Sequence, residues 1–255
     1  MAAGLGVPHF ESLAAMFEQG AGPAAHGVVL ATPNGQHVTG ALECLRHATP
    51  ALIEKPLADD MAAAQRLLAA MKDNSVPMLV GHHRRHSTVL AEARRVIASG
   101  ALGRIVSVNG TALFCKPDSY FEAAPWRSHL GGGPLLINLI HEIDNLRFLC
   151  GEIVAVQAMA SNAVRGFEVE DTAAVTLRFA SGALGSFSLS DSAAAPRSWE
   201  QTSGEDAVYA RYADQDCCFV SGTLGSLAVP TLRRWQVQGL RSWNEPMRCD
   251  PLTAA

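Results

Sequence analysis

The sequence has few charged and few aromatic residues. Charged residues make up 17% of the 255 residues, against about 25% in an average globular protein. The formal net charge is −4, so the chain lacks the excess of Lys and Arg that binding to nucleic acid or to an anionic membrane requires. Aromatic residues, at 6%, are too few for a surface that stacks single-stranded bases. We therefore expect neither a nucleic acid nor a membrane as a partner.

Long apolar runs and cysteine motifs are absent as well. No stretch approaches the roughly 20 apolar residues of a membrane span, and the first residues lack the basic segment of a signal peptide. The six cysteines form no CxxC pair, which excludes a zinc ribbon and a disulfide scaffold and favours reduced thiols in a cytoplasmic protein. The cluster His82–His86 contains two arginines and no carboxylate, so we predict no metal site. The motifs of serine hydrolases, zincins and P-loop NTPases are also missing.

The sequence is 48% hydrophobic, and its first hundred residues alternate short apolar runs with helical patterns. Strands are predicted at 27–31, 51–53 and 76–81. A helix is predicted between the first two strands, because Val38, Ala41, Leu42 and Leu45 share one face. A second helix is predicted over 61–71, before the third strand, with the apolar stripe Met61, Ala64, Leu68 and Met71. Such an alternation predicts a parallel sheet covered on both faces.

The pattern changes near residue 102. A helix over 87–99 ends at Gly100, and longer strands follow at 104–115, 153–161, 172–179 and 183–189, interrupted by a helix over 134–150. The sequence therefore predicts an α/β fold with two domains. Residues 1–101 are expected to form a domain with a parallel sheet, and residues 102–255 an α+β domain with a large, mainly antiparallel open sheet.

Polar residues follow the first two predicted strands. Thr32, Pro33, Asn34 and His37 follow the first, and Glu54, Lys55 and Pro56 follow the second. Open α/β sheets bind ligands at the carboxyl ends of their strands, although a plain turn with a solvated lysine has the same residues. Partial burial would lower the pKa of Lys55, which suits proton transfer to or from an oxygen.

A third group precedes and occupies the helix over 134–150. Gly131, Gly132 and Gly133 allow a backbone to approach a ligand closely. Asn138, His141 and Asn145 have the spacing of one helix face. A lone histidine on a helix can equally be a core residue with its hydrogen bonds satisfied, and this pattern leaves both interpretations open.

Taken in order, these motifs resemble one family over nearly the whole chain. Ala31–Asn34 with His37, Glu54–Pro56, Gly81 with Arg85, Trp126–Arg127, and Gly131–Gly133 with His141 and Asp144 resemble the Gfo/Idh/MocA oxidoreductases, the family of glucose–fructose oxidoreductase and inositol dehydrogenase. The resemblance implies that residues 1–101 are an incomplete NAD(P)-binding Rossmann domain, without its first strand and glycine-rich turn, and that residues 102–255 are the substrate-binding domain. It implies hydride transfer between NAD or NADP and a hydroxyl or carbonyl carbon of a sugar, cyclitol or related polyol. It also implies a homo-oligomer, a dimer or tetramer that forms through the C-terminal sheet.

The resemblance also assigns roles to residues. Thr32, Pro33, Asn34, His37 and Glu54 would lie along the nicotinamide half of the cofactor. Lys55 would contact both nicotinamide and substrate, and His141 would be the general acid/base. Arg85, Trp126, Arg127 and Asn138 would line the substrate pocket.

The sequence departs from the family pattern in three places. Ile137 stands where inositol-dehydrogenase-like members carry an aspartate, four residues before the histidine. No GxGxxG turn is present, and the chain resembles a family member clipped at both ends, so we expect NAD(H) to bind weakly. The alternatives are a non-catalytic relative that binds a metabolite or a partner chain, and a member that uses transient redox for epimerisation or elimination.

Overall fold

The computed structural model describes residues 4, 6–18 and 25–251. The chain divides between His82 and His83 into two compact units. The sequence analysis placed the domain boundary between residues 101 and 102. The two boundaries differ because helix α5 (Thr88–Ala98) belongs to the second unit, where it buries Leu90, Ala93 and Val96 in the hydrophobic core. A helix is assigned to the unit whose core its apolar face completes.

The first unit is a three-stranded parallel sheet with helices. Its elements are α2 (Leu13–Glu18), β1 (Val28–Leu30), the 3₁₀ turn η1 (Asn34–Gln36), α3 (His37–Arg46), β2 (Ala51–Ile53), α4 (Met61–Lys72) and β3 (Met78–Val80). The strand order is β1-β2-β3, and both pairings are parallel. The predicted parallel sheet is therefore confirmed.

One face of this sheet is buried and the other is exposed. Leu30 and Ile53 pack with residues of α3 and α4 in one hydrophobic cluster. On the opposite face, the aligned residues Val29, Leu52 and Leu79 are 67%, 38% and 63% exposed. In the part of the chain that the structure describes, the sheet is covered on one face, whereas the sequence predicted both.

Helix α4 buries a different stripe from the predicted one. Ala63 and Leu67 are its buried residues, while Met61 and Leu68 of the predicted stripe are 73% and 52% exposed. Asp60 caps the helix as expected, accepting a hydrogen bond from the backbone N–H of Ala63 at 2.7 Å.

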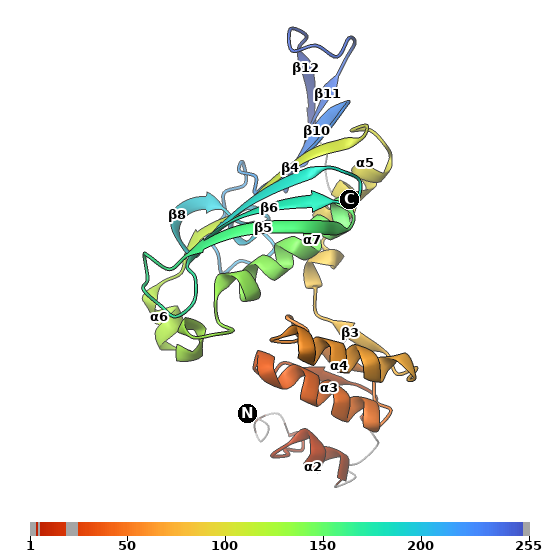
Figure 1. Cartoon of the computed structure of the whole chain (residues 1–255), viewed down its shortest axis with the longest axis vertical. Helices are drawn as coiled ribbons and strands as arrows, with labels where there is room; N and C mark the ends of the chain where they lie inside the picture. Colours follow the sequence, from red (N-terminus) through yellow and green to blue (C-terminus); the bar gives the residue numbers. More distant parts are fainter. Residues whose placement is uncertain (1–3, 5, 19–24, 252–255) are drawn as a thin grey trace. The chain divides into compact units, whose positions relative to one another are not determined.

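The second unit is built around one large sheet (Figure 1). Its strands are β4 (Ile105–Cys115), β5 (Ile153–Ser161), β6 (Thr172–Phe179), β7 (Leu184–Ser190), β8 (Ser192–Arg197), β9 (Cys218–Gly222), β10 (Gly225–Val229), β11 (Arg233–Val237) and β12 (Met247–Pro251). The order is β12-β11-β10-β9-β4-β7-β6-β5, with β8 paired to β4. Among the described residues of this sheet, β4 and β7 pair in parallel and the other neighbouring strands pair antiparallel. The mainly antiparallel open sheet is confirmed.

Helices and short turns accompany this sheet. They are η2 (His83–His86), α5, α6 (Asp118–Glu122), η3 (Pro125–Ser128), the π-helical turn η4 (Leu135–Leu139), α7 (Ile140–Cys150) and α8 (Trp199–Thr202). The predicted helix over 134–150 is therefore a π-helical turn followed by an α-helix. Single π turns inside helices occur frequently at functional sites.

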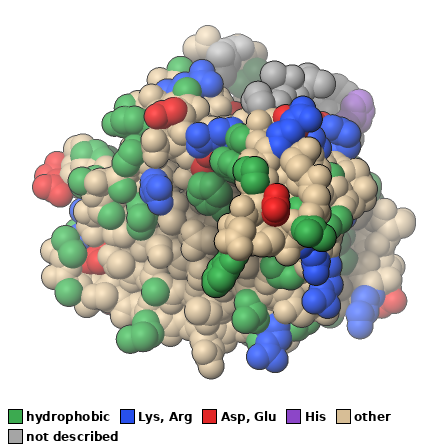
Figure 2. Space-filling model, turned by 90° about the horizontal axis from the view of Figure 1, so that it is seen from above, with side chains coloured by type: hydrophobic (Ala, Val, Ile, Leu, Met, Phe, Trp, Pro, Cys, Tyr) green, Lys and Arg blue, Asp and Glu red, His purple; other side chains and the backbone are tan. Residues whose placement is uncertain are grey.

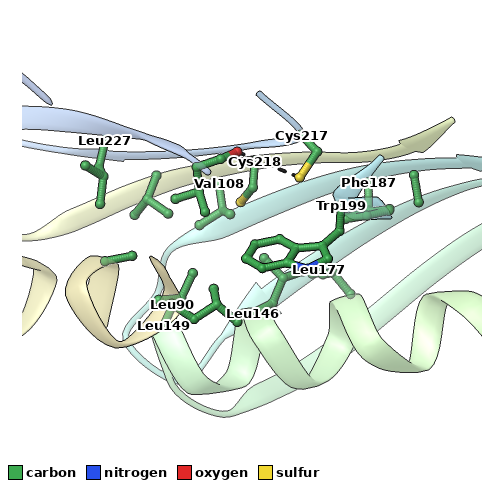
Figure 3. Packing of buried hydrophobic residues seen from close by; sticks show 14 of the residues in the cluster. Leu90, Val108, Leu146, Leu149, Leu177, Phe187, Trp199, Cys217, Cys218 and Leu227 are labelled. Atoms are coloured by element: carbon green, nitrogen blue, oxygen red, sulfur yellow. Dashed lines mark hydrogen bonds between the residues drawn. The ribbon is translucent and has the colours of Figure 1, made fainter. Parts of the chain in front are cut away.

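The core of the second unit lies between one face of the sheet and helices α5 and α7 (Figure 3). Val175, Leu177 and Phe179 of β6 and Phe187 of β7 are at least 95% buried, as the alternating sequence of these strands predicts.

Within the described residues, no helix is long and apolar enough to cross a membrane. Uncharged atoms cover most of the face in Figure 2, consistent with the low charged content of the sequence.

Candidate functional site

The carboxyl ends of the parallel strands bring together the polar residues of the first unit. The Glu54 N–H donates to the Leu30 carbonyl oxygen at 2.9 Å, and the Gly81 N–H donates to that of Ile53 at 2.7 Å, so the segments after β1, β2 and β3 lie side by side. Thr32 is exposed, and Lys55 is half-buried. We refer to Thr32, Pro33, Asn34, Glu54 and Lys55 as the strand-end edge.

Gly81 makes room for Glu54 at this edge. A Cβ atom at Gly81 would lie 3.3 Å from Glu54 Oε1 and 3.4 Å from Glu54 Oε2. The carboxylate therefore lies over the backbone at the end of β3, where a larger residue would crowd it.

His37 is a structural brace for this edge. It is 1% exposed, and its ring nitrogens contact two carbonyl oxygens, Nδ1 that of Pro56 at 2.7 Å and Nε2 that of Thr32 at 2.8 Å. The imidazole thus ties the loop after β1 to the loop after β2. Sequence reasoning predicted a cofactor contact for His37; in the structure both nitrogens bind the protein's own backbone.

In the second unit, His141 lies in the first turn of α7 and is 6% exposed. Its ring meets the exposed His83 ring edge-on, with 5.0 Å between ring centroids. Ile137, which takes the place of the family's aspartate, is 8% exposed. The His83 ring is therefore a direct neighbour of the His141 ring.

The two arginines after His83 form ion pairs with the same helix. Arg84 is 4% exposed and donates to carboxylate oxygens of Glu142 and, at 2.7 Å, of Glu200. Burial raises the pKa of the Glu142 carboxyl, and Arg84 opposes that rise. Arg85, predicted to line the pocket, forms a bidentate pair with Asp144, with both distances 2.8 Å.

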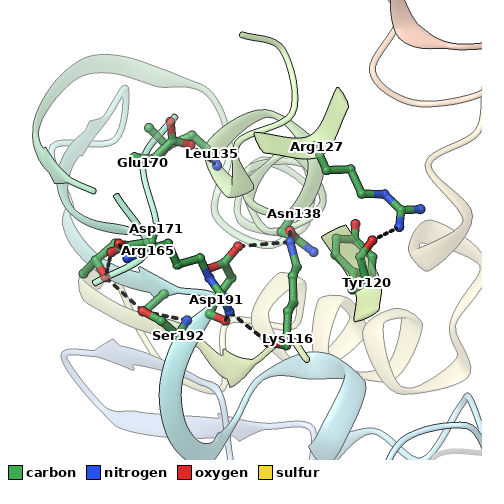
Figure 4. Close-up of polar contacts among 12 residues, drawn as sticks. Lys116, Tyr120, Arg127, Leu135, Asn138, Arg165, Glu170, Asp171, Asp191 and Ser192 are labelled. Carbon is green, nitrogen blue, oxygen red and sulfur yellow. Dashed lines mark hydrogen bonds and ion pairs between the residues drawn. The ribbon is translucent and has the colours of Figure 1, made fainter. Parts of the chain in front are cut away.

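Arg127, another predicted pocket residue, contacts Tyr120. The Arg127 guanidinium lies 3.8 Å from the centre of the Tyr120 ring, and its Nη1 donates to the Tyr120 carbonyl oxygen at 2.7 Å. Trp126 is 44% exposed. Asn138 lies in the π-helical turn, where its Oδ1 accepts a hydrogen bond from Lys116 Nζ at 2.7 Å (Figure 4).

Lys116 is the residue that sequence reasoning missed. It follows β4 directly, is 8% exposed, and its Nζ also lies 3.5 Å from Asp191 Oδ2. Burial lowers its pKa to about 8, while Asp191 opposes that decrease. A signal was available, because Lys116-Pro117 follows an apolar strand just as Lys55-Pro56 does.

The glycines before the π-helical turn allow close approach of the protein's own chain. A Cβ atom at Gly132 would lie 2.5 Å from the Arg127 Cα, and one at Gly133 would lie 2.4 Å from Glu170 Oε1. Glu170 Oε1 accepts a hydrogen bond from the Leu135 N–H at 2.7 Å. These contacts anchor the start of the turn that carries Asn138.

Two family models match the chain. One, described as "Oxidoreductase family, NAD-binding Rossmann fold", matches residues 1–82, and the other, "GFO/IDH/MocA C-terminal domain", matches residues 90–228. The chain belongs to the GFO/IDH/MocA oxidoreductase family. The predicted family is thereby confirmed, and the segments matched agree with the two compact units.

Named members of the GFO/IDH/MocA family are similar over part of their length. Levoglucosan dehydrogenase of Pseudarthrobacter phenanthrenivorans is 32% identical over 190 residues, which cover 64% of this chain and 49% of that protein. Inositol 2-dehydrogenase of Rubrobacter xylanophilus is 30% identical over 164 residues, 62% and 45% of the two chains. The chain thus spans about half the length of the curated relatives that it matches.

Solved structures of GFO/IDH/MocA proteins share the fold. The WlbA dehydrogenase from Bordetella pertussis, in complex with NADH and UDP-GlcNAcA, matches with a TM-score of 0.74 and 27% identity over 91% of this chain and 61% of that one. A levoglucosan dehydrogenase complex matches with a TM-score of 0.75 and 24% identity over 98% and 67% of the two chains.

Proposed function

We propose that the chain is an NAD(P)-dependent oxidoreductase that transfers a hydride between the nicotinamide and a hydroxyl or carbonyl carbon of a sugar, cyclitol or related polyol. The observation that carries the proposal is the strand-end edge. It places a half-buried lysine beside a carboxylate at the carboxyl ends of parallel strands, where sheets of this class bind ligands. The NAD-binding family model covers this edge, and related proteins are named as sugar and inositol dehydrogenases.

The strand-end edge fits the nicotinamide part of a dinucleotide. Thr32 and Pro33 are exposed, and the Glu54 carboxylate lies over Gly81 beside them. We propose that these residues and Asn34 hold the nicotinamide ribose and ring, with His37 as the brace that fixes their loop. When bound, the cofactor supplies the acceptor or donor of the hydride.

Lys55 and His141 are the residues proposed to handle the proton. Oxidation of a secondary alcohol removes a hydride from carbon and a proton from oxygen, and reduction reverses both. The Lys55 ammonium would donate a hydrogen bond to the reacting oxygen and hold it in place. The His141 imidazole would accept the hydroxyl proton, with the ring of exposed His83 next to it.

Variant kinetics at millimolar NAD(P)⁺ test these roles. Levoglucosan and myo-inositol are the first substrates to try, and formation of reduced nicotinamide is followed by its absorbance. We expect Lys55→Met and His141→Asn each to lower kcat about 10²–10⁴-fold, the usual contribution of a positioned acid or base. Lys72→Met and His129→Asn are matched controls, because both residues are exposed. Unchanged turnover in either test variant would remove that residue from the mechanism.

We also propose that two copies pair through the open face of the large sheet. The exposed residues on its strands include short polar ones, Ser107, Asn109, Thr176, Ser186 and Ser188, and larger apolar ones such as Met159 and Leu184. Short side chains let two sheets stack closely, at about 10 Å. Asn109 Nδ2 donates to Ser186 Oγ at 2.8 Å, so polar groups on this face are already paired within it.

A cytoplasmic location is proposed from the cysteines. Cys44, Cys217 and Cys218 are free and buried, and free thiols persist in a reducing compartment.

A further inference from the structure

The outer strand β12 has an open edge at one end of the large sheet. It pairs with β11, and within the described residues no strand pairs with its other edge. β11, β12 and the loop between them form an arm, residues 233–251, at the end of the sheet (Figure 1). Leu240 and Trp243, in the loop of this arm, are 80% and 97% exposed. An unpaired strand edge is a template on which a further strand can add.

The backbone groups of alternate β12 residues point out of this edge. The Val237 N–H donates to the Leu224 carbonyl oxygen at 3.1 Å, so Val237 directs its backbone groups away from β12. Its partner in the β11–β12 register is Met247. Opposed residues in an antiparallel pair either exchange hydrogen bonds or both point theirs outward, in alternation. Met247 and, two residues further on, Cys249 therefore direct their N–H and C=O groups to the open edge.

Charges of opposite sign flank Cys249 on this edge. Arg248 and Asp250 share one face of β12, and Arg248 Nε donates to Asp250 Oδ1 at 2.7 Å. Arg248 and Cys249 are exposed. Edge charges keep a second strand away where like charges meet. A second β12, turned antiparallel about Cys249, would instead bring its Asp250 opposite Arg248 and its Arg248 opposite Asp250. The edge is therefore complementary to itself.

The same charges select one register. Two identical antiparallel strands are related by a two-fold axis perpendicular to the sheet, and opposed side chains share a face, so the axis passes through a residue. An axis at Arg248 would oppose two arginines, and an axis at Asp250 would oppose two aspartates, which is destabilising. An axis at Cys249 gives two attractive pairs and lets the outward N–H and C=O groups of the two Cys249 residues bond to each other.

Side chains of β11 extend both faces of such a junction. In the β11–β12 register Arg234 lies opposite Asp250, and Trp235 lies opposite Cys249. Arg234 Nη2 is 3.8 Å from Asp250 Oδ2. Asp250 would therefore stand between Arg234 of its own copy and Arg248 of the second copy. On the opposite face, the two half-buried Trp235 rings would flank the two Cys249 side chains, so one face of the junction is charged and the other apolar.

We propose that the open edge of β12 binds the β12 of a second copy of this chain, antiparallel about a two-fold axis at Cys249. The two large sheets then continue into each other, and the edge of β12 is no longer open in either copy. This contact is separate from stacking through the open sheet face, and it requires neither cofactor nor substrate.

The contact between two β12 strands is small. Each copy contributes five residues of strand, which is less than the roughly 1,200–2,000 Å² of stable interfaces requires. We therefore expect it to form at submillimolar protein concentration, where it joins copies or pairs of copies, and to be dissociated at micromolar concentration.

Cross-linking at Cys249 tests the proposal. Hydrogen-bonded residues opposed in an antiparallel pair have Cα atoms about 5.5 Å apart, so a short bismaleimide can join the two thiols by one addition at each end. Cys115 is the other exposed cysteine among the described residues, and Cys115→Ser removes it. At submillimolar concentration we expect Cys115→Ser to form a covalent dimer on a denaturing gel, and Cys115→Ser with Cys249→Ser to form little or none.

Charge reversal in the Cys115→Ser protein distinguishes specific pairing from random collision. Asp250→Arg turns both symmetry-related pairs from attractive to repulsive and should slow cross-linking about tenfold. Addition of Arg248→Asp restores opposite signs and should restore the rate. Asp73→Arg makes the same change of charge at an exposed position of the first unit and should leave the rate within twofold. Circular dichroism establishes that each variant is folded.

The outcomes decide between an edge contact and its alternatives. If Asp250→Arg does not fold, Arg248→Asp alone is the single reversal. Absence of a covalent dimer in Cys115→Ser, or equal cross-linking rates in the single and the double reversal, would overturn the proposal. Cross-linking that persists with Ala174→Arg, a substitution on the open sheet face, supports a separate contact, whereas its loss there would contradict one.

Discussion

The titration of Lys116 is a direct consequence of its burial. Lys116 is 8% exposed, and burial lowers its pKa from 10.5 to about 8. One pKa unit corresponds to about 1.4 kcal/mol between the two protonation states. Protonated Lys116 therefore lowers the free energy of unfolding by about 3 kcal/mol relative to a lysine whose pKa does not change on folding.

The sign of the pH dependence follows from this shift. Between pH 8 and pH 10.5 the unfolded chain keeps a proton on Lys116 that the folded chain has released. The free energy of unfolding therefore rises with pH in this window and is independent of Lys116 below it. Lys116→Met lacks this contribution, so the stability of the wild type relative to Lys116→Met should improve by about 2–3 kcal/mol from pH 7 to pH 10.

Urea denaturation of both proteins at the two pH values measures this difference. Other groups that titrate in the same range, such as tyrosines and cysteines, cancel because both proteins carry them. The chain has three lysines, so ¹³C-dimethyl-lysine NMR can also follow Lys116 directly, with Lys116→Met identifying its signal. A midpoint near 10.5 for all three lysines, or a stability difference that stays constant with pH, would refute the reasoning.

Three further substitutions probe the fold and the assembly. His37→Ala should cost about 1–3 kcal/mol of unfolding free energy, because a buried hydrogen bond from the imidazole to a backbone carbonyl oxygen is lost. A cost no larger than that of exposed His47→Ala would show that the brace is unimportant. Gly132→Ala should cost about 1–3 kcal/mol because its Cβ would overlap backbone atoms of Trp126 and Arg127, whereas Gly27→Ala, whose Cβ would make an ordinary contact with Pro50, should change stability little. Ala174→Arg, on the open sheet face, should convert the proposed dimer to monomers, as measured by light scattering at matched concentration. Val164→Arg, in an exposed loop, should leave the mass of the wild type unchanged. Equal masses for the wild type and both variants would contradict pairing through this face.

Strand periodicity was the most reliable signal in the sequence. β5 and β6 have the predicted bounds. In β6 buried and exposed residues alternate, whereas every residue of β5 after Ile153 is exposed. Helix α4 shows where such a signal fails. Its Ala-rich sequence offers two neighbouring stripes, Ala63–Leu67 and Ala64–Leu68, which composition alone cannot distinguish. In the structure Ala63 and Leu67 are buried against residues of β1 and β2.

The candidate site was predictable as a set of strand-end and helix positions, but not as a set of contacts. Lys116 binds Asn138, 22 residues away, and approaches Asp191, 75 residues away. These pairings depend on how β4, η4 and the β7–β8 junction meet, which local patterns do not encode. His37 was recognisable from its motif, yet its burial between two carbonyl oxygens follows only from the packing of the two loops.

The central claim is hydride transfer to a nicotinamide, and isotope transfer tests it most directly. Levoglucosan or myo-inositol, deuterated at the ring carbons, is incubated with the full chain and millimolar NAD⁺ or NADP⁺, and the cofactor is analysed by mass spectrometry. The account predicts deuterium in the reduced cofactor, with little or none in Lys55→Met and His141→Asn and normal transfer in Lys72→Met. Absence of label in the reduced cofactor with both substrates, from folded protein, would contradict it.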